Sequence, residues 1–244
     1  MAKSAVKIAI VHHSGYGHTA KVAEHVRQGA TSVGDAVVHL CKAEDLTSPD
    51  KGPWDEPDKA DAIIFGSPTY MGSASGVMKT FIDASSKAWL NRAWANKIAA
   101  GFTVSGSLSR DKTVTLQQFA TLAAQQGMIW VGNDIPSGYN SSKSDFATAH
   151  NRAGHFLGLA VQALTDLPAE QTPDRYDLET AERFGKRVAE ATQRWVRVPA
   201  EPELAQRTGR VRSWPESVRA VPVPVSRHLP LAIRGQFLPL SPRL

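Results

Sequence analysis

Residues 8–20 have the sequence Ile8-Ala9-Ile10-Val11-His12-His13-Ser14-Gly15-Tyr16-Gly17-His18-Thr19-Ala20, in which four apolar residues lead into a cluster of small and hydroxyl residues. A helical pattern follows directly. A buried strand that turns abruptly into a helix leaves backbone N–H groups at the helix start without partners, and together with the helix dipole they form a seat for a phosphate. Gly15 and Gly17 let the backbone close around such a group, and the hydroxyls of Ser14 and Thr19 add donors. The stretch therefore predicts a phosphate-binding loop.

Three kinds of phosphate loop compete for this stretch. A nucleoside-triphosphate loop requires Lys-Ser or Lys-Thr after its last glycine, and neither Gly15 nor Gly17 is followed by that pair. The dinucleotide pattern G-x-G-x-x-[GA] is present as Gly15, Gly17 and Ala20, but three polar residues separate its first glycine from the apolar run, and the next strand, 36–40, lacks an acidic residue at its end. The hydroxyl-rich loop that holds the phosphate of FMN in flavodoxin-like proteins fits best. An ordinary strand–turn–helix junction capped by Ser14 is the structural alternative.

Composition restricts the class of protein. The apolar fraction of 42% in 244 residues is ample for a core. The single cysteine, Cys41, excludes a disulfide framework and a CxxC metal or redox site, which suits a reducing cytoplasm. We find neither a signal-type segment at the N-terminus nor an apolar stretch of membrane-spanning length. These features predict a cytoplasmic protein without membrane insertion.

The positive charge is concentrated in the C-terminal part of the chain. From Val198 onward there are seven Arg, no Lys and three Glu, so this segment carries +4 of the net charge of +5, and residues 1–197 are close to neutral. Eight of the fifteen prolines lie in the same segment. We therefore predict a domain over 1–197 without a nucleic-acid groove, followed by a disordered Pro/Arg-rich extension over 198–244.

Apolar runs alternate with helical patterns along the domain. The patterns predict strands at 8–11, 36–40, 61–65, 98–104 and 128–131, and helices at 20–31, 77–88, 113–126 and 177–196, with one helical turn near 54–59. The segment 132–165 is harder to assign: 132–150 is a polar excursion, and 155–164 either extends the last strand or forms a short helix.

The alternation predicts an α/β fold, a doubly wound parallel sheet with helices on both faces. Ligands of such sheets lie beyond the carboxyl ends of the strands. The first, third and fourth predicted strands all end in loops rich in Gly and Ser, at 14–19, 67–76 and 105–112. Three such loops at one edge predict a ligand site there.

With all three loops located, the chain resembles the flavodoxin-like flavoproteins, and within them the NADPH-dependent FMN reductase and tryptophan-repressor-binding-protein-type NAD(P)H:quinone oxidoreductases. The resemblance covers roughly residues 5–197. It is carried by Ser14-Gly15-Tyr16-Gly17-His18-Thr19, Gly66-Ser67-Pro68-Thr69-Tyr70-Met71-Gly72, Ser105-Gly106-Ser107, Asp111-Lys112 and Gln126-Gly127-Met128. It implies a flavodoxin-like five-stranded sheet in the order 2-1-3-4-5.

The resemblance also implies a set of cofactor-binding residues for FMN. They are Ser14, Gly15, Tyr16, Gly17, His18 and Thr19 around the phosphate, Pro68, Thr69, Tyr70, Met71 and Gly72 along the isoalloxazine ring, and Ser105, Gly106 and Ser107 on its other side. Tyr16 and Tyr70 are expected to line the substrate pocket. Trp89 stands where the quinone oxidoreductases have an aromatic residue that reaches a neighbouring subunit's flavin site, although a buried core Trp is the alternative.

Two departures from the family pattern affect substrate preference. Leu108, Ser109 and Arg110 stand where the third loop of the quinone oxidoreductases is almost entirely Gly and Thr. Gln126 aligns with a His that contacts the flavin in those enzymes. Both changes bear on the acceptor and on flavin geometry more than on flavin binding.

The resemblance implies an oxidoreductase in which FMN carries the chemistry. NAD(P)H would reduce FMN and leave, and a quinone or flavin acceptor would take its place, so no catalytic side chain and no metal is required. A homodimer or homotetramer is expected. The rivals are a flavodoxin-type electron carrier, a class that is typically strongly acidic around the flavin, and a flavin-binding regulatory protein without turnover.

Overall fold

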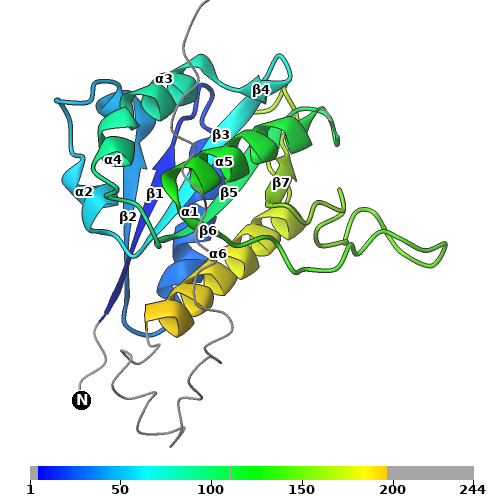
Figure 1. Cartoon of the computed structure of the whole chain (residues 1–244). Coiled ribbons are helices and arrows are strands. Elements are labelled where there is room, and N and C mark those ends of the chain that lie inside the picture. The colour runs from blue at the N-terminus through cyan, green and yellow to red at the C-terminus, as the bar shows by residue number, and fades with distance from the viewer. Residues whose placement is uncertain (1–4, 110, 197–244) are drawn as a thin grey trace, which may run out of the picture. The chain divides into compact units, whose positions relative to one another are not determined.

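The computed structural model describes residues 5–109 and 111–196. Their elements are, in order, β1 (Val6–His12), α1 (His18–Thr31), β2 (Ala36–Lys42), the 3₁₀ turn η1 (Ala43–Leu46), α2 (Asp55–Lys59), β3 (Ala62–Tyr70), β4 (Ser73–Ala74), α3 (Gly76–Ala84), α4 (Ser86–Leu90), β5 (Ile98–Ser105), α5 (Lys112–Gln126), β6 (Ile129–Trp130), β7 (Leu159–Gln162) and α6 (Arg175–Val196). Figure 1 shows a sheet with helices against both faces. The predicted extension 198–244 lies outside the described residues.

The sheet confirms the predicted α/β class. Its order is β2-β1-β3-β5-β6, and the four pairings between these strands are parallel. These are the five predicted strands in the expected order 2-1-3-4-5. Among the described residues the sheet has seven strands rather than five, because β4 forms a short hairpin with β3 and β7 also pairs with β5.

The last strand of the sheet is divided into two pieces. β6 pairs with the start of β5, at Ile98 and Ala99, whereas β7 pairs with its end, from Phe102 to Ser105. The predicted alternative in which 155–164 extends the last strand is therefore the one observed. Residues 131–158 form an irregular insertion between the two pieces. Because β7 runs parallel to β5, the loop that follows it lies at the same edge as the predicted site.

A hydrophobic core covers each face of the sheet. On one face the strand residues pack against α1 and α6, with Ile8, Ile10, Ile64 and Phe184 fully buried. On the other face they pack against α3 to α5. There Phe65, Phe81, Trp94 and Phe119 are fully buried and form an aromatic cluster with ring centroids 5.8–6.3 Å apart. Burial of both faces explains the continuous apolar runs of the central strands.

Helices α1 and α6 approach closely through two glycines. A Cβ atom on Gly29 would stand 1.8 Å from the carbonyl oxygen of Glu182, and one on Gly185 would stand 2.0 Å from that of Val26. Both distances are far below van der Waals contact, so a side chain at either position would push the helices apart. Because neither glycine has a side chain, α6 lies directly against α1, the helix that follows the first loop.

Strand β3 is longer than predicted. Residues Ser67 to Tyr70 were expected in a loop, yet they continue β3 and pair with β5 as far as Pro68, opposite Val104. Pro68, which has no N–H to donate, is nevertheless accommodated in the strand. His13 donates to the Gly66 carbonyl (3.0 Å), so the polar groups of Gly66 face β1, and those of Pro68, two residues later, face the same side beyond the end of β1. No ladder bond is lost there.

The helix predicted over 77–88 is broken into α3 and α4 at Ser85. The Ser85 N–H donates to the carbonyls of Phe81 and Ile82, and its hydroxyl donates to Ile82 (2.7 Å). Gln126, buried at the end of α5, donates from Nε2 to the Ser85 hydroxyl (3.1 Å) and carbonyl (3.3 Å). The break is therefore fixed by a tertiary contact that helical periodicity does not reveal.

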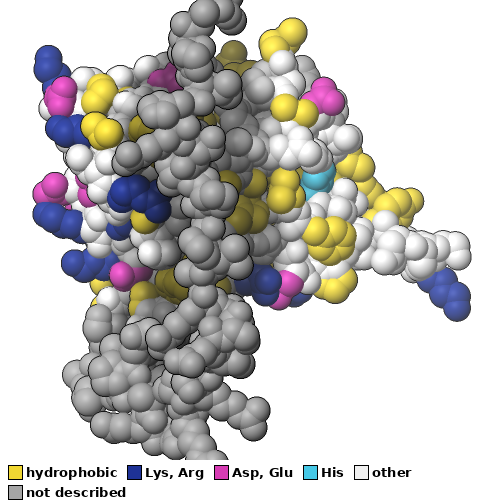
Figure 2. Space-filling view, viewed as in Figure 1, with side chains coloured by type: hydrophobic (Ala, Val, Ile, Leu, Met, Phe, Trp, Pro, Cys, Tyr) yellow, Lys and Arg dark blue, Asp and Glu magenta, His cyan; other side chains and the backbone are white. Residues whose placement is uncertain are grey.

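The surface over α2 to α4 carries charges of both signs. Figure 2 shows Lys and Arg mixed with Asp and Glu along this edge. The pairs are Lys59 with Asp55, Lys79 with Asp83, and Lys87 with Asp50, at 2.6–2.8 Å. Such exposed pairs contribute little to stability. Within the described ranges, none of the helices has both the length and the apolar character that crossing a membrane requires.

Candidate functional site

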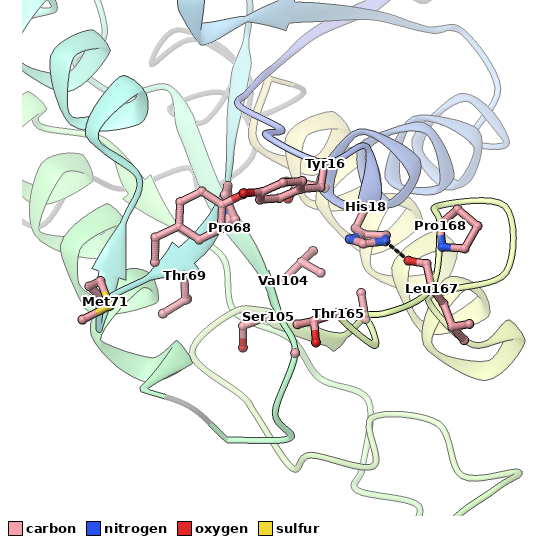
Figure 3. Close-up of a pocket in the computed structure, with 14 residues that line it drawn as sticks. Tyr16, His18, Pro68, Thr69, Met71, Val104, Ser105, Thr165, Leu167 and Pro168 are labelled. Atoms are coloured by element: carbon pink, nitrogen blue, oxygen red, sulfur yellow. Dashed lines mark hydrogen bonds between the residues drawn. The ribbon is translucent and has the colours of Figure 1, made fainter.

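A pocket of about 690 Å³ lies at the carboxyl edge of the sheet, within the usual range for sites that bind small molecules. Its walls come from the ends of β3 and β5, the start of α1 and the segment after β7. The lining residues are Tyr16, His18, Thr19, Pro68, Thr69, Tyr70, Met71, Val104, Ser105, Gly106, Ala163, Thr165, Leu167 and Pro168. Figure 3 shows Tyr16 and His18 on one side of this cavity, with Ser105 and Thr165 across from them.

The first predicted loop forms one end of the pocket at the start of α1. Gly17 precedes the helix with φ +87°, a conformation that favours glycine. Ser14 does not line the pocket. Instead its hydroxyl accepts a hydrogen bond from the Ala20 N–H (3.1 Å) and caps the helix. His18 and Thr19, the first two residues of the helix, line the pocket, so an anion bound at this end would meet the start of α1.

Tyr16 and Tyr70 lie together at the pocket. Their rings meet edge to face, with centroids 6.3 Å apart and planes at 71°. Tyr16 is 79% exposed and Tyr70 is 38% exposed, so both rings retain surface for another molecule. Burial, with a smaller contribution from Tyr16, raises the pKa of the Tyr70 phenol, so the group is neutral near pH 7 and keeps its O–H as a donor for a ligand.

The second predicted loop is a strand end followed by a tight hairpin. Thr69 lines the pocket, and its hydroxyl is bonded to those of Thr103 (2.7 Å) and Thr115 (2.8 Å), which fixes β3, β5 and α5 to one another. Met71 and Gly72 form the two-residue turn between β3 and β4, both with positive φ. Met71 is 96% exposed although it lines the pocket. A strained, exposed Met at a pocket edge is typical of a binding surface.

The third predicted loop closes the opposite wall. Ser105 and Gly106 line the pocket, whereas Ser107 does not. Gln162 of β7 donates to the Gly106 carbonyl (3.0 Å), and Lys112, fully buried at the start of α5, donates from Nζ to the carbonyls of Ser107 and Leu108. The loop is therefore held from behind by two side chains that do not touch the pocket.

A fourth wall was missed by the sequence prediction. We call residues 163–170, between β7 and α6, the strap. Ala163, Thr165, Leu167 and Pro168 of the strap line the pocket, as does Val104 of β5. His18 donates from Nε2 to the Leu167 carbonyl (2.9 Å), the dashed line in Figure 3. The available signal was the polar pair Thr165-Asp166 after the mostly apolar run 156–164, because a polar loop after a parallel strand lies at the ligand edge.

The structure brings together nine of the predicted site residues at the pocket: Tyr16, His18, Thr19, Pro68, Thr69, Tyr70, Met71, Ser105 and Gly106. Ser14, Gly15, Gly17, Gly72 and Ser107 belong to the same loops without lining it. Trp89 lies on α4, 46% exposed, and does not line this chain's own pocket. Gln126 does not line it either and holds Ser85.

The two histidines that precede the first loop, His12 and His13, have structural roles. His12 is buried at the end of β1, and burial lowers its pKa, so the ring is neutral near pH 7. His13 is paired with Glu44, with Nδ1 2.7 Å from the carboxylate. Neither lines the pocket.

The pocket has the polarity that FMN requires. None of its described lining residues is Asp, Glu, Lys or Arg, so an anionic phosphate would be held by helix-start N–H groups and hydroxyls at the α1 end. The other end offers two tyrosines, Met71 and the sides of β3 and β5 to a flat ring. A Cβ on Gly17 would stand 3.1 Å from that of Ala169, which shows how closely the first loop and the strap meet. The residues therefore fit a phosphate-bearing planar cofactor.

Comparison with known proteins agrees with this geometry. Residues 6–140 match the family described as NADPH-dependent FMN reductase. The chain is 39% identical over 183 residues to flavodoxin FldP of Pseudomonas aeruginosa, covering 75% of this chain and 95% of that one. It is 30% identical over 204 residues to an NAD(P)H dehydrogenase (quinone) of Geobacter sulfurreducens, covering 76% and 97%. The crystal structure of a flavodoxin, a WrbA-like protein of Agrobacterium tumefaciens, matches with a TM-score of 0.57 at 37% identity, covering 78% and 98%.

Proposed function

We propose that this chain, which belongs to the NADPH-dependent FMN reductase family, passes hydride from NAD(P)H through bound FMN to a quinone or a similar flat acceptor. Because the chain belongs to this family and has a relative named NAD(P)H dehydrogenase (quinone), it is a flavodoxin-like oxidoreductase. The donor, the acceptor and the residues that meet them are our proposal.

The FMN would lie with its phosphate at the start of α1 and its ring toward β3 and β5. We assign the phosphate end to the loop Ser14, Gly15, Tyr16, Gly17, His18 and Thr19, the ring to Pro68, Thr69, Tyr70, Met71 and Gly72, and its far side to Ser105, Gly106 and Ser107. Bound FMN accepts hydride from a nicotinamide and gives the electrons to an acceptor, which is chemistry the side chains cannot perform.

The observation that carries the proposal is the open, aromatic part of the pocket. Tyr16 and Tyr70 keep exposed ring surface beside the space assigned to the ring, and Met71, which follows Tyr70 in the hairpin, is almost fully exposed. A second flat molecule gains about 0.5–1.5 kcal/mol for each aromatic pair it forms there. Donor and acceptor would use this surface in turn.

The chain's own residues bind and orient rather than exchange protons with the substrate. The described lining residues include only His18 and the two tyrosines as titratable groups, and His18 has one ring nitrogen engaged with Leu167. Thr69 is held by two threonine hydroxyls, so the strand end beneath the ring is rigid. Such preorganisation favours reaction by positioning.

We also propose a homodimer or homotetramer in which Trp89 approaches the flavin site of a neighbouring subunit. Trp89 and Leu90 are 46% and 74% exposed on α4, which leaves them available to a second copy. Replacing Trp89 with Ala should lower quinone turnover and leave the Kd for FMN unchanged. A lower turnover accompanied by a smaller assembly in sedimentation would support the shared site, and unchanged turnover would exclude it.

An anaerobic flavin spectrum tests the enzymatic function. The full chain is loaded with FMN, mixed with NADPH or NADH, and then with benzoquinone. Rapid bleaching of the bound-flavin bands, followed by their return, is the expected result. Bands that resist both nucleotides but bleach with dithionite would overturn the reductase proposal, and failure to bind FMN would overturn the cofactor assignment as well.

The second candidate is an electron carrier, which the 39% identity to a flavodoxin favours. A carrier would pass electrons to a protein partner through a complex that weakens as salt rises. Figure 2 shows mixed charges over α2 to α4 rather than an acidic field on that face. Slow oxidation of NAD(P)H together with salt-sensitive electron transfer to a redox protein would select the carrier. A flavin-binding regulatory protein would show neither.

A further inference from the structure

Met71 presents its side chain to solvent at the edge of the pocket. At 96% it is the most exposed of the large apolar side chains in the described part of the chain. Such exposure forgoes the stabilisation that burial of an apolar side chain provides. Figure 3 shows Met71 on the β3 side of the cavity, across from Leu167 and Pro168. Its thioether is therefore open to reagents in solution.

The backbone holds Met71 in this exposed position. Its φ of +47° lies in the left-handed region, which residues with a Cβ rarely adopt. The strand ends on both sides of the turn are paired, Thr69 with Ala74 and Tyr70 with Ser73. A strained residue persists where the surrounding structure fixes it in this way. The exposure of Met71 is thus a property of the anchored hairpin.

The other described sulfur atoms belong to buried side chains. Met78 of α3 and Met128, just before β6, are 0% and 8% exposed and lie in the core on the side of α3 to α5. Cys41 is also buried, and burial raises the pKa of its thiol to about 11, so little reactive thiolate is present near pH 7. Of the sulfur atoms in the described ranges, that of Met71 is the one an oxidant reaches first.

We propose that Met71 is a modification site, oxidised by hydrogen peroxide to the sulfoxide, and that its oxidation weakens the binding of a flat acceptor at the pocket. A sulfur–oxygen bond forms, the oxygen–oxygen bond of the peroxide breaks, and water leaves. The sulfur is oxidised by two electrons and the peroxide is reduced by two. Methionine sulfoxide reductases reverse the change, so it can act as a switch.

The sulfoxide would stand beside the aromatic surface that we assign to the acceptor. Met71 lines the pocket next to Tyr70, whose ring meets that of Tyr16 edge to face. A thioether is apolar and polarisable and attracts aromatic rings, whereas a sulfoxide is polar. Loss of this attraction raises the Kd for a flat ligand roughly twofold to tenfold. This half of the inference rests on the proposed function, and the oxidation itself does not.

Peptide mapping by mass spectrometry tests the modification site. The full chain as purified is exposed to hydrogen peroxide, and sulfoxide is followed separately in the peptides that carry Met71, Met78 and Met128. The same chain unfolded in urea gives the rate of each methionine without protection. Met71 should oxidise at nearly its unfolded rate, and the two buried methionines at least about tenfold below theirs. Protection of Met71 comparable to that of Met78 overturns the proposal.

Ligand binding tests the consequence of the oxidation. The probe is tetramethylbenzoquinone, whose ring carbons are all substituted and therefore do not add lysines or thiols. Its Kd is measured on the FMN-loaded chain without an electron donor, before peroxide, after peroxide has acted and been removed, and after methionine sulfoxide reductases. The Kd should rise roughly twofold to tenfold and then return. An unchanged Kd after complete oxidation of Met71 overturns the proposal.

Met71→Leu is the matched control variant, because leucine keeps an apolar side chain that peroxide does not oxidise. Each chain is compared with itself before and after peroxide, so the effect of the substitution on binding cancels. Peroxide should leave the Kd of Met71→Leu unchanged, and a rise equal to that of the parent chain overturns the proposal. Failure of the untreated parent chain to bind FMN or the quinone is a different result. It overturns the proposed function, whereas the peptide map still decides whether Met71 is the oxidation site.

Discussion

The phenol oxygen of Tyr70 lies against the backbone of Gly15, and a Cβ atom on that glycine would stand 2.6 Å from it. The contact joins the first loop to the end of β3 at the place where the Tyr16 ring meets the Tyr70 ring. Gly15 does not line the pocket, yet its missing side chain decides where a lining residue stands. The glycine therefore matters for the orientation of Tyr70 rather than for direct contact with a ligand.

Replacing Gly15 with Ala should disturb the pocket and leave the fold intact. Only the far end of the Tyr70 side chain must move, because Tyr70 atoms are the ones that crowd the added methyl group. We expect the Kd for FMN to rise roughly threefold to tenfold, equivalent to about 1 kcal/mol, with an unchanged unfolding temperature. Gly34→Ala is the control, since a Cβ there meets nothing within 4 Å. Equal affinities in both variants would contradict the role of this contact.

The contact between α1 and α6 gives a prediction about stability. Gly185→Ala would place a methyl group 2.0 Å from the Val26 carbonyl oxygen. The Val26 carbonyl belongs to the backbone and cannot move aside as a side chain can. We therefore expect a loss of at least about 2 kcal/mol in the free energy of unfolding, measured in urea. Gly76→Ala in α3 adds a methyl group in open space, and it should be neutral or stabilising by up to about 1 kcal/mol. Comparable losses in both variants would contradict close packing as the cause.

The sheet and three of the pocket walls could be predicted because their signals are local. An apolar run followed by Gly and Ser occurs within some ten residues at each of β1, β3 and β5, and parallel pairing then brings the loops to one edge. The strap could not be found in this way. Its strand, β7, is separated from β6 by residues 131–158, and only its pairing with Phe102 to Ser105 of β5 places it at the pocket.

The sequence also could not predict which single side chains make tertiary contacts that hold a loop or a helix break. Lys112 and Gln126 were noted as motif residues, but nothing local shows that one holds two carbonyls of a loop and the other holds Ser85 at a helix break. The hydroxyl of Ser14 was predicted to bind phosphate, with a helix cap as the alternative; in the structure it accepts the Ala20 N–H at the start of α1, and its role toward a phosphate stays a prediction. Patterns predict which face of an element is buried, whereas such contacts depend on which elements meet.

The buried pair of Arg152 and Asp177 gives a prediction about pH. Their side chains are 8% and 5% exposed with 2.6 Å between Nη2 and Oδ2, and they join the insertion to α6. Burial raises the pKa of Asp177, while Arg152 opposes that rise. Because the folded pKa lies above the unfolded one, stability falls as the pH rises through the folded value. Arg152→Met removes the guanidinium that opposes this rise in pKa. The stability that the variant loses relative to the parent chain should therefore grow as the pH rises.

We expect Arg152→Met to lose about 3–5 kcal/mol of unfolding free energy at pH 7.5, and clearly less at pH 4.5, where more of Asp177 is protonated. Urea titrations of parent and variant at both pH values measure this, and the other titrating groups cancel in the difference. Arg175→Met, which removes an exposed partner of Glu179, should lose less than about 1 kcal/mol at pH 7.5. A deficit in Arg152→Met that does not depend on pH would contradict the charge argument.

The strap should loosen when its tie to α1 is removed. His18 donates to the Leu167 carbonyl, and Lys21 donates to the Glu170 carbonyl from an exposed position (3.1 Å). His18→Phe keeps a ring of similar size but loses the donor. Removing a bond worth about 1 kcal/mol should speed amide exchange over 163–170 by roughly fivefold, and it should raise the Kd for FMN because Thr165 and Leu167 line the pocket.

Hydrogen-exchange mass spectrometry of peptides that cover 163–172 measures the effect of His18→Phe, with Lys21→Met as the matched variant. The exposed lysine contact competes with water, so its loss should change exchange by less than roughly twofold. The amide of Leu167 donates to the Leu164 carbonyl (3.4 Å), and that of Leu164 donates to the Thr172 hydroxyl (3.1 Å), so both report directly on the strap. If exchange in the strap is the same in His18→Phe as in the parent chain, the strap is held by its own turns and by packing against Gly17, and His18 serves the ligand alone.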